Sequence, residues 1–445
     1  MKKELKIGFT VFSGLLVVLA LWFFRPWSDY SPYKIVAFRS SHTEAQWFAN
    51  FHKVLPSRRI APSESPRQWP RAIQDLNVTY EWEGQQKTLQ DYMAQTGVTG
   101  FMLLQDGAIA YEHHANGSTP ETRNMVWSIA KSYTVTILGL ALKEGVIKSL
   151  DDTVATYAPR FEGTAYGDTS IRHIAMMSSG INFGPENKWG PISLWIKTYF
   201  DLTARQLDMD DVAAGMDRLT PPGVEFRYRF PDTHVISAVL RGAYAESYGG
   251  SVTWAQLVED KLWKPFGFGG EAFWVISPAG EKGTSWGHAG VSMRLLELAQ
   301  LGQVYLENGV PYGIQEGEEN SGSRFTYGWL DGVSKPNASF QEPAPDSFYA
   351  HQGYSRQFWI PQDYDGEFMA LGGFDQVLWI DLKRNAVIAQ TAAGSRYGGV
   401  SPPEQFKLFR AIIAASSAEV IKDVGIQDVG IQDAQDVSIL TPSHN

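Results

Sequence analysis

The sequence has 445 residues, 44% of them hydrophobic and 19% charged, with 15 Trp, 19 Tyr and 24 Phe. This apolar and aromatic content is enough for a sizeable core, which excludes a peptide-sized scaffold and a chain that is disordered throughout. The 48 acidic and 38 basic residues give a net charge of -10 without a basic stripe, which argues against a nucleic-acid partner, and the absence of cysteine excludes disulfides, thiolate metal sites and a cysteine nucleophile.

The first element along the chain is an apolar run at residues 7–24, IGFTVFSGLLVVLALWFF, which carries no charge. As a helix this run is about 27 Å long, close to the thickness of a hydrocarbon core of about 30 Å. A cleaved signal peptide is the alternative, but its apolar part is shorter, and bulky aromatic residues stand where small ones would direct cleavage. Three lysines before the run predict a cytoplasmic N-terminus. We therefore expect residues 1–30 to be an uncleaved single-pass anchor in the inner (plasma) membrane, with the rest of the chain on the exported, periplasmic side.

The next part of the chain, residues 31–85, is rich in Pro, Ser and Arg and shows no sustained periodicity. It is predicted to be an extended arm on the surface of a domain that spans residues 86–415. That domain opens with two apolar runs at 98–114, joined by Asp106-Gly107, a pair that tolerates the positive φ angles of a tight turn. This pattern predicts a β-hairpin.

The centre of the domain has helical patterns. Residues 127–147 carry apolar side chains at helical spacing on nearly every side, and Gly145 supplies a stop, so a buried helix is predicted there. Two further helical patterns occupy residues 234–246 and 295–306.

Strand-like runs return after residue 355, broken by turn signals, and a helix is predicted over 403–415. One early hairpin, central helices and late strands predict an α+β fold, in which a single antiparallel sheet is built from both ends of the domain and flanked by helices, with a helical subdomain. The last residues, 416–445, hold a near-repeat rich in Gly and Asp that fits neither helix nor strand, and we expect a disordered acidic tail.

Ser128 and Lys131 form a Ser-x-x-Lys pair at the start of the buried helix, where the spacing places both side chains on one face. A lysine desolvated by apolar surroundings loses basicity, and its neutral amine can take the proton of a serine hydroxyl. The spacing alone is a weak signal, because Ser31 and Lys34 show it as well. On the spacing alone, the favoured interpretation is that Ser128 is a helix N-cap and Lys131 a surface lysine.

Further motifs follow this pair: residues 148–152 read KSLDD, residues 172–173 are Arg-His, and residues 177–180 read MSSG. With them, the chain from about residue 85 to 415 resembles the serine β-lactamase-related hydrolases, and among these the class C β-lactamase-like esterases and amidases of the 6-aminohexanoate-dimer hydrolase type. The resemblance implies a β-lactamase/transpeptidase-like fold. It also implies a hydrolase that forms an acyl-enzyme on Ser128 without a metal or an organic cofactor.

The resemblance also implies a tyrosine opposite the Ser-Lys pair, and the matching residue is Tyr228, whose phenol could relay a proton. Many penicillin-recognising relatives carry an asparagine two residues later, where this chain has Phe230. On the residues alone, Tyr228 is equally well interpreted as a buried aromatic of a turn.

The third element of the family is an edge of the sheet, often Lys-Thr-Gly, which maps onto residues 370–373, Ala-Leu-Gly-Gly. The resemblance implies that the N–H groups of Gly373 and Ser128 form an oxyanion hole, and Gly372 lets the backbone approach a ligand closely. An alanine in place of the lysine argues for an uncharged or differently anchored substrate. A bulge in a strand is the other interpretation of the glycines, and residues 351–353 are a second placement of this edge.

Several other residues have weaker signals for a binding role. Trp189 is expected either to line the pocket or to belong to the core. His113 and His114 point to opposite faces if they lie on a strand, and no third ligand has a useful spacing, so no metal site is predicted. The acids Asp151 and Asp152 are interpreted as caps of the next helix.

These features predict an exported, membrane-anchored serine hydrolase whose substrates are small amides or esters. Two alternatives stay open. One is a penicillin-binding D-peptidase or β-lactamase, which the missing lysine and asparagine disfavour, and the other is a non-catalytic interaction module that retains the fold.

Overall fold

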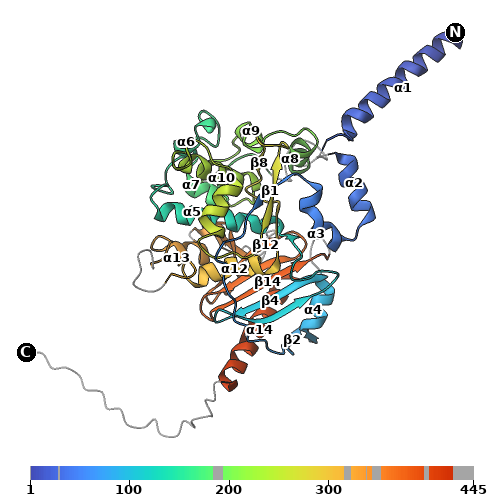
Figure 1. Cartoon of the computed structure of the whole chain (residues 1–445). Coiled ribbons are helices and arrows are strands. Elements are labelled where there is room, and N and C mark those ends of the chain that lie inside the picture. Colours follow the sequence, from blue (N-terminus) through green and yellow to red (C-terminus); the bar gives the residue numbers. More distant parts are fainter. Residues whose placement is uncertain are drawn as a thin grey trace, which may run out of the picture.

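The computed structural model describes residues 2–28, 31–183, 194–314, 322–336, 338–342, 352–394 and 400–423, and Figure 1 shows their arrangement. The helices are α1 (Lys2–Phe24), α2 (Pro32–Ser41), α3 (Glu44–Val54), α4 (Leu89–Thr96), α5 (Ala130–Lys143), α6 (Val154–Tyr157), α7 (Ile171–Ala175), α8 (Leu194–Thr203), α9 (Met209–Ala214), α10 (Phe230–Tyr244), α11 (Trp254–Val258), α12 (Leu295–Leu306), α13 (Trp329–Ser334) and α14 (Pro402–Asp423). The strands are β1 (Ser57–Ile60), β2 (Thr79–Trp82), β3 (Gln85–Thr88), β4 (Val98–Gln105), β5 (Ala108–His114), β6 (Asn124–Met125), β7 (Ala272–Ser277), β8 (Thr284–Ser285), β9 (Val291–Met293), β10 (Gln352–Ser355), β11 (Phe358–Pro361), β12 (Glu367–Gly372), β13 (Gln376–Asp381) and β14 (Ala386–Ala392).

The main sheet is antiparallel, and within the described residues its strand order is β10-β11-β12-β13-β14-β4-β5. The predicted hairpin is present as β4 and β5, and both residues of its turn, Asp106 (φ 51°) and Gly107 (φ 78°), have the positive φ angles that this dipeptide tolerates. Strand β14 pairs with β4, with Gln105 opposite Ala386. The prediction that an antiparallel sheet is built from both ends of the domain is therefore confirmed. The prediction of a single sheet is wrong, because β1, β7, β9 and β6 form a second sheet with β8 beside β7, and β2 pairs with β3.

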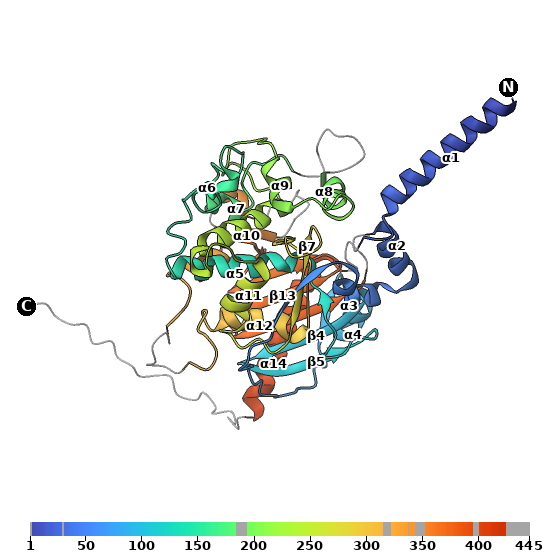
Figure 2. The same cartoon turned by 45° about the horizontal axis from the view of Figure 1, so that its top comes forward.

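The alternation of side chains along β4 supplies both faces of the sheet. Met102 and Leu104 belong to the core under the helical layer, whereas Phe101 and Leu103 belong to the core on the other face. Helix α12 packs across β4, β13 and β14 on the first side, and α4 and α14 contact β4. Helices α5 and α10 pack against each other above the sheet, as Figure 2 shows. The architecture is the α+β arrangement that the sequence predicts.

The buried helix predicted at 127–147 is divided into two parts. Residues Trp127–Ile129 form a short 3-10 turn, η1, and α5 follows it. The side chains of α5 are buried from Ala130 to Ala141, as its nearly uniform apolar pattern predicts. After the helix, Gly145 has a φ of 72°, the left-handed conformation that ends helices.

The arm at residues 31–85 contains more regular structure than its composition indicates. A capping box starts α3, in which the Gln46 N–H donates to Thr43 Oγ1 at 3.3 Å and the Thr43 N–H donates to Gln46 Oε1 at 3.0 Å. Helix α3 then buries Trp47, Phe48 and Phe51. The apolar face of α3 is too short to give a periodic signal in the sequence.

The prediction of a membrane anchor is wrong. Residues Lys2–Phe24 do form a helix that projects from the body of the molecule (Figure 2). However, over the parts of the chain that the structure describes, no helix is both long enough and apolar enough to cross a membrane. The same finding contradicts the predictions that depend on this anchor. These are the single-pass anchor at residues 1–30, the membrane as a partner, and the localisation to the inner membrane with a periplasmic domain.

The C-terminal helix is longer than predicted. The sequence pattern predicts a helix over 403–415, and α14 extends to Asp423. The part of the predicted disordered acidic tail (416–445) that follows Asp423 lies outside the described residues.

Candidate active site

Ser128 and Lys131 meet where η1 passes into α5. Their side chains lie within hydrogen-bond distance, with 3.0 Å between Lys131 Nζ and Ser128 Oγ. The same Nζ donates to the backbone carbonyl oxygen of His288, also at 3.0 Å. Ser128 is partly exposed, whereas Lys131 is only 2% exposed. The pair thus joins a hydroxyl that a substrate can reach to an amine that is kept from water.

Burial sets the charge of this amine. Desolvation lowers the pKa of Lys131 from 10.5 to about 7, because its ammonium form loses hydration in the apolar surroundings of α5. Near neutral pH a large fraction of the side chain is therefore neutral and able to accept the proton of Ser128.

Tyr228 lies beside this pair, in the segment that leads into α10. The segment is held by the Arg227 N–H, which donates to the Met177 carbonyl oxygen at 2.9 Å. Lys131 Nζ is 5.0 Å from the centre of the Tyr228 ring. Burial raises the pKa of Tyr228 well above 10, while a hydrogen bond with the Ser128 side chain acts in the opposite direction. The phenol is therefore protonated at neutral pH and can donate.

The end of β12 lies next to the segment before Ser128. A Cβ atom on Gly372 would overlap the carbonyl oxygen of Val126, so only glycine fits this close backbone approach. A Cβ atom on Gly373 would be 3.8 Å from the Trp127 ring, at ordinary van der Waals distance. The structure thus brings the predicted glycine pair to the segment that precedes Ser128.

The second placement of the sheet edge, residues 351–353, is less well supported. His351 lies outside the described residues. Gln352 and Gly353 are on β10, which among the described strands is at the end of the sheet and pairs with β11. Trp189 also lies outside the described residues, so its predicted role stays a prediction.

Comparison with known proteins identifies the family. The profile of the beta-lactamase family matches residues 86–397. The chain belongs to the beta-lactamase family of serine hydrolases.

Relatives within this family are distant in sequence. A 6-aminohexanoate-dimer hydrolase of Paenarthrobacter ureafaciens is 22% identical over 314 residues, covering 68% of this chain and 75% of that protein. A provisionally named 6-aminohexanoate-dimer hydrolase from Bacillus anthracis has a structure with a TM-score of 0.69 at 19% identity, covering 85% of this chain and 94% of the other. A family VIII carboxylesterase has a TM-score of 0.53 at 16% identity, covering 71% and 91%. The shared fold confirms the predicted β-lactamase/transpeptidase-like architecture.

His288 is a site residue of this beta-lactamase family member that the sequence analysis missed. Its carbonyl oxygen accepts a hydrogen bond from Lys131, and its ring stacks on Phe230 with 4.3 Å between the ring centres. Within the described residues, neither nitrogen of the buried ring has a hydrogen-bond partner. Burial and the nearby Lys131 hold the pKa of His288 well below 6.5, so the ring is neutral. No spacing in the sequence links it to Ser128, which lies 160 positions earlier.

The other candidates from the sequence have structural roles. Ser31 caps α2, and Lys34 beside it is exposed. Asp151 pairs with Arg172 at 2.7 Å, and Asp152 accepts a hydrogen bond from the Ser149 N–H at 3.1 Å. Over the described part of the chain, no three His, Asp or Glu side chains are arranged to hold a metal ion.

The pKa of Lys131 leads to a prediction about pH. Because the neutral amine is the reactive form, kcat/KM for an uncharged ester should rise about tenfold per pH unit below about pH 7 and level off above about pH 8. Initial rates with p-nitrophenyl butyrate, measured across this range and corrected for spontaneous hydrolysis, test the prediction. A profile that stays flat from about pH 5.5 to 8.5 would show that Lys131 does not act as the base.

Proposed function

We propose that this serine hydrolase cleaves small, uncharged esters and amides through an acyl-enzyme on Ser128. The observation that carries the proposal is the 3.0 Å contact between Ser128 Oγ and the buried Lys131 amine, whose pKa is about 7. A serine hydroxyl becomes an effective nucleophile when a neutral base of this kind removes its proton.

The acylation step follows from this geometry. Ser128 Oγ attacks the carbonyl carbon of the substrate as its proton passes to Lys131 Nζ. The negative charge that develops on the carbonyl oxygen is stabilised by the N–H groups of Ser128 and Gly373, a contribution of about 3 kcal/mol per donor in other hydrolases. Tyr228, which is protonated and hydrogen-bonded to Ser128, donates a proton to the leaving group and is reprotonated from Lys131.

Deacylation uses the same groups in the reverse direction. A water molecule takes the position of the leaving group, Lys131 receives its proton, and the hydroxide adds to the acyl carbon. Collapse of the tetrahedral intermediate expels Ser128 Oγ, which regains a proton from the Lys131 ammonium. The cycle therefore needs only residues that this chain supplies.

The surroundings of the pair favour an uncharged substrate. Phe230, at the position of the family asparagine, is 3% exposed and stacks on His288. Ala370, at the position of the family lysine, is 1% exposed. Neither side chain can bind a carboxylate. The names of two relatives, a 6-aminohexanoate-dimer hydrolase and a carboxylesterase, support amides and esters as the substrate classes.

The arginines near these positions already have partners. Arg227 pairs with Glu225 at 3.3 Å. Arg229 is fully buried and donates to backbone carbonyl oxygens. Arg356 donates to the carbonyl oxygen of Trp329 at 3.4 Å and lies over its ring. A substrate carboxylate would have to compete with these contacts.

Labelling with a fluorophosphonate tests the proposed function. The probe should form a covalent adduct on wild-type protein, and peptide mass spectrometry should place the adduct on Ser128. The variant Ser128→Ala should neither be labelled nor hydrolyse p-nitrophenyl butyrate. Labelling that persists in this variant, or an adduct on another residue, would reject Ser128 as the nucleophile and with it the proposed mechanism.

The alanine at residue 370, where the family has a lysine, leads to a second test, which concerns the choice of substrate. Losing a charge-assisted contact costs about 1.5 to 3 kcal/mol, so kcat/KM for p-nitrophenyl butyrate should exceed that for nitrocefin, which bears a carboxylate, by about 10- to 100-fold. Comparable or greater efficiency with nitrocefin would favour a β-lactamase or a penicillin-binding peptidase instead.

A further inference from the structure

We propose that helix α3 of the N-terminal arm positions the oxyanion hole, and that Phe48 is the residue through which it acts. The inference rests on the proposed function, because it takes the N–H groups of Ser128 and Gly373 as the oxyanion donors. Residues 44–54 lie outside the segment that matches the beta-lactamase family, 86–397. The catalytic domain would thus depend on a helix that the matched family segment does not include.

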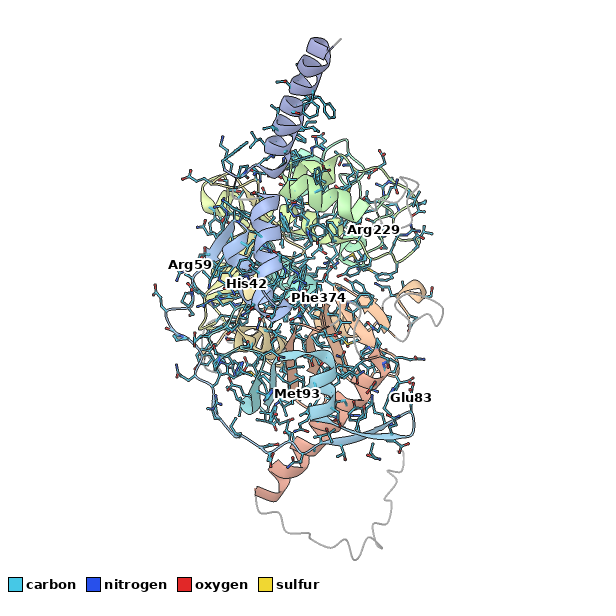
Figure 3. All side chains as sticks on the ribbon, turned by 90° about the vertical axis from the view of Figure 1, so that its right-hand side faces the viewer. His42, Arg59, Glu83, Met93, Arg229 and Phe374 are labelled. Atoms are coloured by element: carbon cyan, nitrogen blue, oxygen red, sulfur yellow. The ribbon has the colours of Figure 1, made fainter. Side chains whose placement is uncertain are left out.

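Three aromatic rings connect α3 to the two donors. The centre of the Phe48 ring is 5.5 Å from that of Trp127 and 4.8 Å from that of Phe374, both in edge-on geometry. Trp127 and Phe374 are 5.3 Å apart, which closes the triangle. Figure 3 labels Phe374, which lies near the centre of the molecule beside the blue helices of the arm. Trp127 immediately precedes Ser128, and Phe374 immediately follows Gly373.

The backbone at both neighbours is strained in a way that requires support. Trp127 has a φ of 49° and Phe374 a φ of 64°, in the left-handed region. For a bulky residue this conformation costs about 1 to 2 kcal/mol, and it persists only where the surroundings determine it. The packing of Phe48 between the two rings supplies such surroundings. Phe48 is itself 1% exposed, so its ring has little freedom to move away.

The strain matters because it lies in the peptide groups next to the donors. The N–H of Ser128 belongs to the peptide bond that joins it to Trp127, so a rotation at Trp127 turns this donor directly. The Gly373 N–H belongs to the peptide bond with Gly372, so Phe374 acts on this donor less directly, through the φ and ψ angles of Gly373. Loss of the aromatic triangle lets both residues relax toward ordinary φ values, and the two N–H groups then no longer converge on one point. A misplaced oxyanion donor raises the free energy of the transition state more than it weakens the binding of the substrate.

Helix α3 also offers a matched control. Trp47 is adjacent in sequence and 8% exposed, and its aromatic contacts are with Phe38 of α2 and Phe51 of α3, at 5.5 and 5.3 Å between ring centres. Truncating Trp47 therefore weakens the packing of the arm on itself without removing a ring from the triangle. Phe51 of α3 also contacts Trp127, with 5.8 Å between ring centres, but only Phe48 contacts both Trp127 and Phe374. A general loss of stability would affect both variants, whereas direct support of the two rings is lost only in the Phe48 variant.

The experiment compares Phe48→Ala, Phe48→Tyr and Trp47→Ala with wild-type full-length protein, using p-nitrophenyl butyrate at a temperature where circular dichroism shows each variant folded. Phe48→Ala should lower kcat and kcat/KM together by about 10- to 100-fold, with KM changed less than about threefold, which is the pattern for an interaction made only in the transition state. Phe48→Tyr, which keeps the ring, should restore most of kcat. Trp47→Ala should stay within about threefold of wild type.

Two results would overturn the inference: wild-type kcat in Phe48→Ala, or an equal loss in Trp47→Ala. If Phe48→Ala does not fold, Phe48→Leu replaces it, because leucine fills most of the volume but removes the ring contacts. A wild-type kcat in Phe48→Leu would overturn the inference in the same way. Ser128→Ala separates this outcome from failure of the proposed function. If that variant is inactive while Phe48→Ala is fully active, only the role of α3 is rejected; if Ser128→Ala retains turnover, the proposed nucleophile itself is wrong.

Discussion

Replacing Lys131 with arginine should lower kcat/KM for p-nitrophenyl butyrate by about 10³-fold or more. A guanidinium keeps its proton at every accessible pH, so Lys131→Arg cannot accept the proton of Ser128 even though its length and hydrogen-bonding capacity are similar. Lys131→Met provides a second variant, which removes the amine and nearly keeps the side-chain volume. Ester hydrolysis and fluorophosphonate labelling, both measured on folded protein, report the loss.

The arm provides the control for this substitution. Ser31 and Lys34 have the same spacing as Ser128 and Lys131, but Lys34 is exposed and Ser31 is the N-cap of α2. Lys34→Arg should therefore leave turnover unchanged. Turnover within about tenfold of wild type in Lys131→Arg would contradict the role of Lys131 as a neutral base.

A second large effect is expected at the end of β12. Gly372→Ala would push a methyl group into the carbonyl oxygen of Val126, so either β12 or the loop before Ser128 must shift. Since the loss of one oxyanion donor costs about 10²- to 10³-fold in kcat, a displacement that separates the two donors should cost a comparable factor. The measurement is kcat for p-nitrophenyl butyrate together with the melting temperature.

The neighbouring glycine shows whether the effect depends on position. Gly373→Ala keeps the proposed donor N–H and places its methyl group 3.8 Å from Trp127, so kcat should fall by less than about fivefold. Equal losses in the two variants would mean that the edge of β12 tolerates no side chain at all, and that the close approach to Val126 is not the cause.

The sequence predicts those parts of the fold that have strong local signals. Asp106-Gly107 predicts a hairpin because few other dipeptides tolerate positive φ at two successive positions, and the structure has this turn. The uniform apolar pattern of α5 predicts burial on all sides, which the structure also shows. In the same way, Ser128 and Lys131 are close because one helical turn separates them. This proximity follows from local backbone geometry and does not need contacts with distant segments.

Contacts between distant segments leave no such signal. His288 reaches Lys131 only through the tertiary fold, and Phe48 lies in a stretch whose Pro, Ser and Arg content masks a short amphipathic helix. The run at 7–24 shows the opposite error, since an uncharged run predicted a membrane span where the described helix does not qualify as one. The glycines at 372 and 373 could be placed only through the family resemblance, because glycines in a strand equally indicate a bulge.

The pairing of β4 with β14 has a consequence for biosynthesis. Gln105 lies opposite Ala386, so this contact closes a loop of about 280 residues, at an entropic cost of about 5 kcal/mol, and it cannot form until most of the chain has left the ribosome. Ser128 and Lys131 emerge in the first third of translation, on a helix that can already form. The edge of β12 and the ring of Phe374 come only near the end. The protein thus makes the proposed nucleophile early and the glycine edge of the proposed site last, which leaves the growing chain without a complete catalytic centre until the sheet can close.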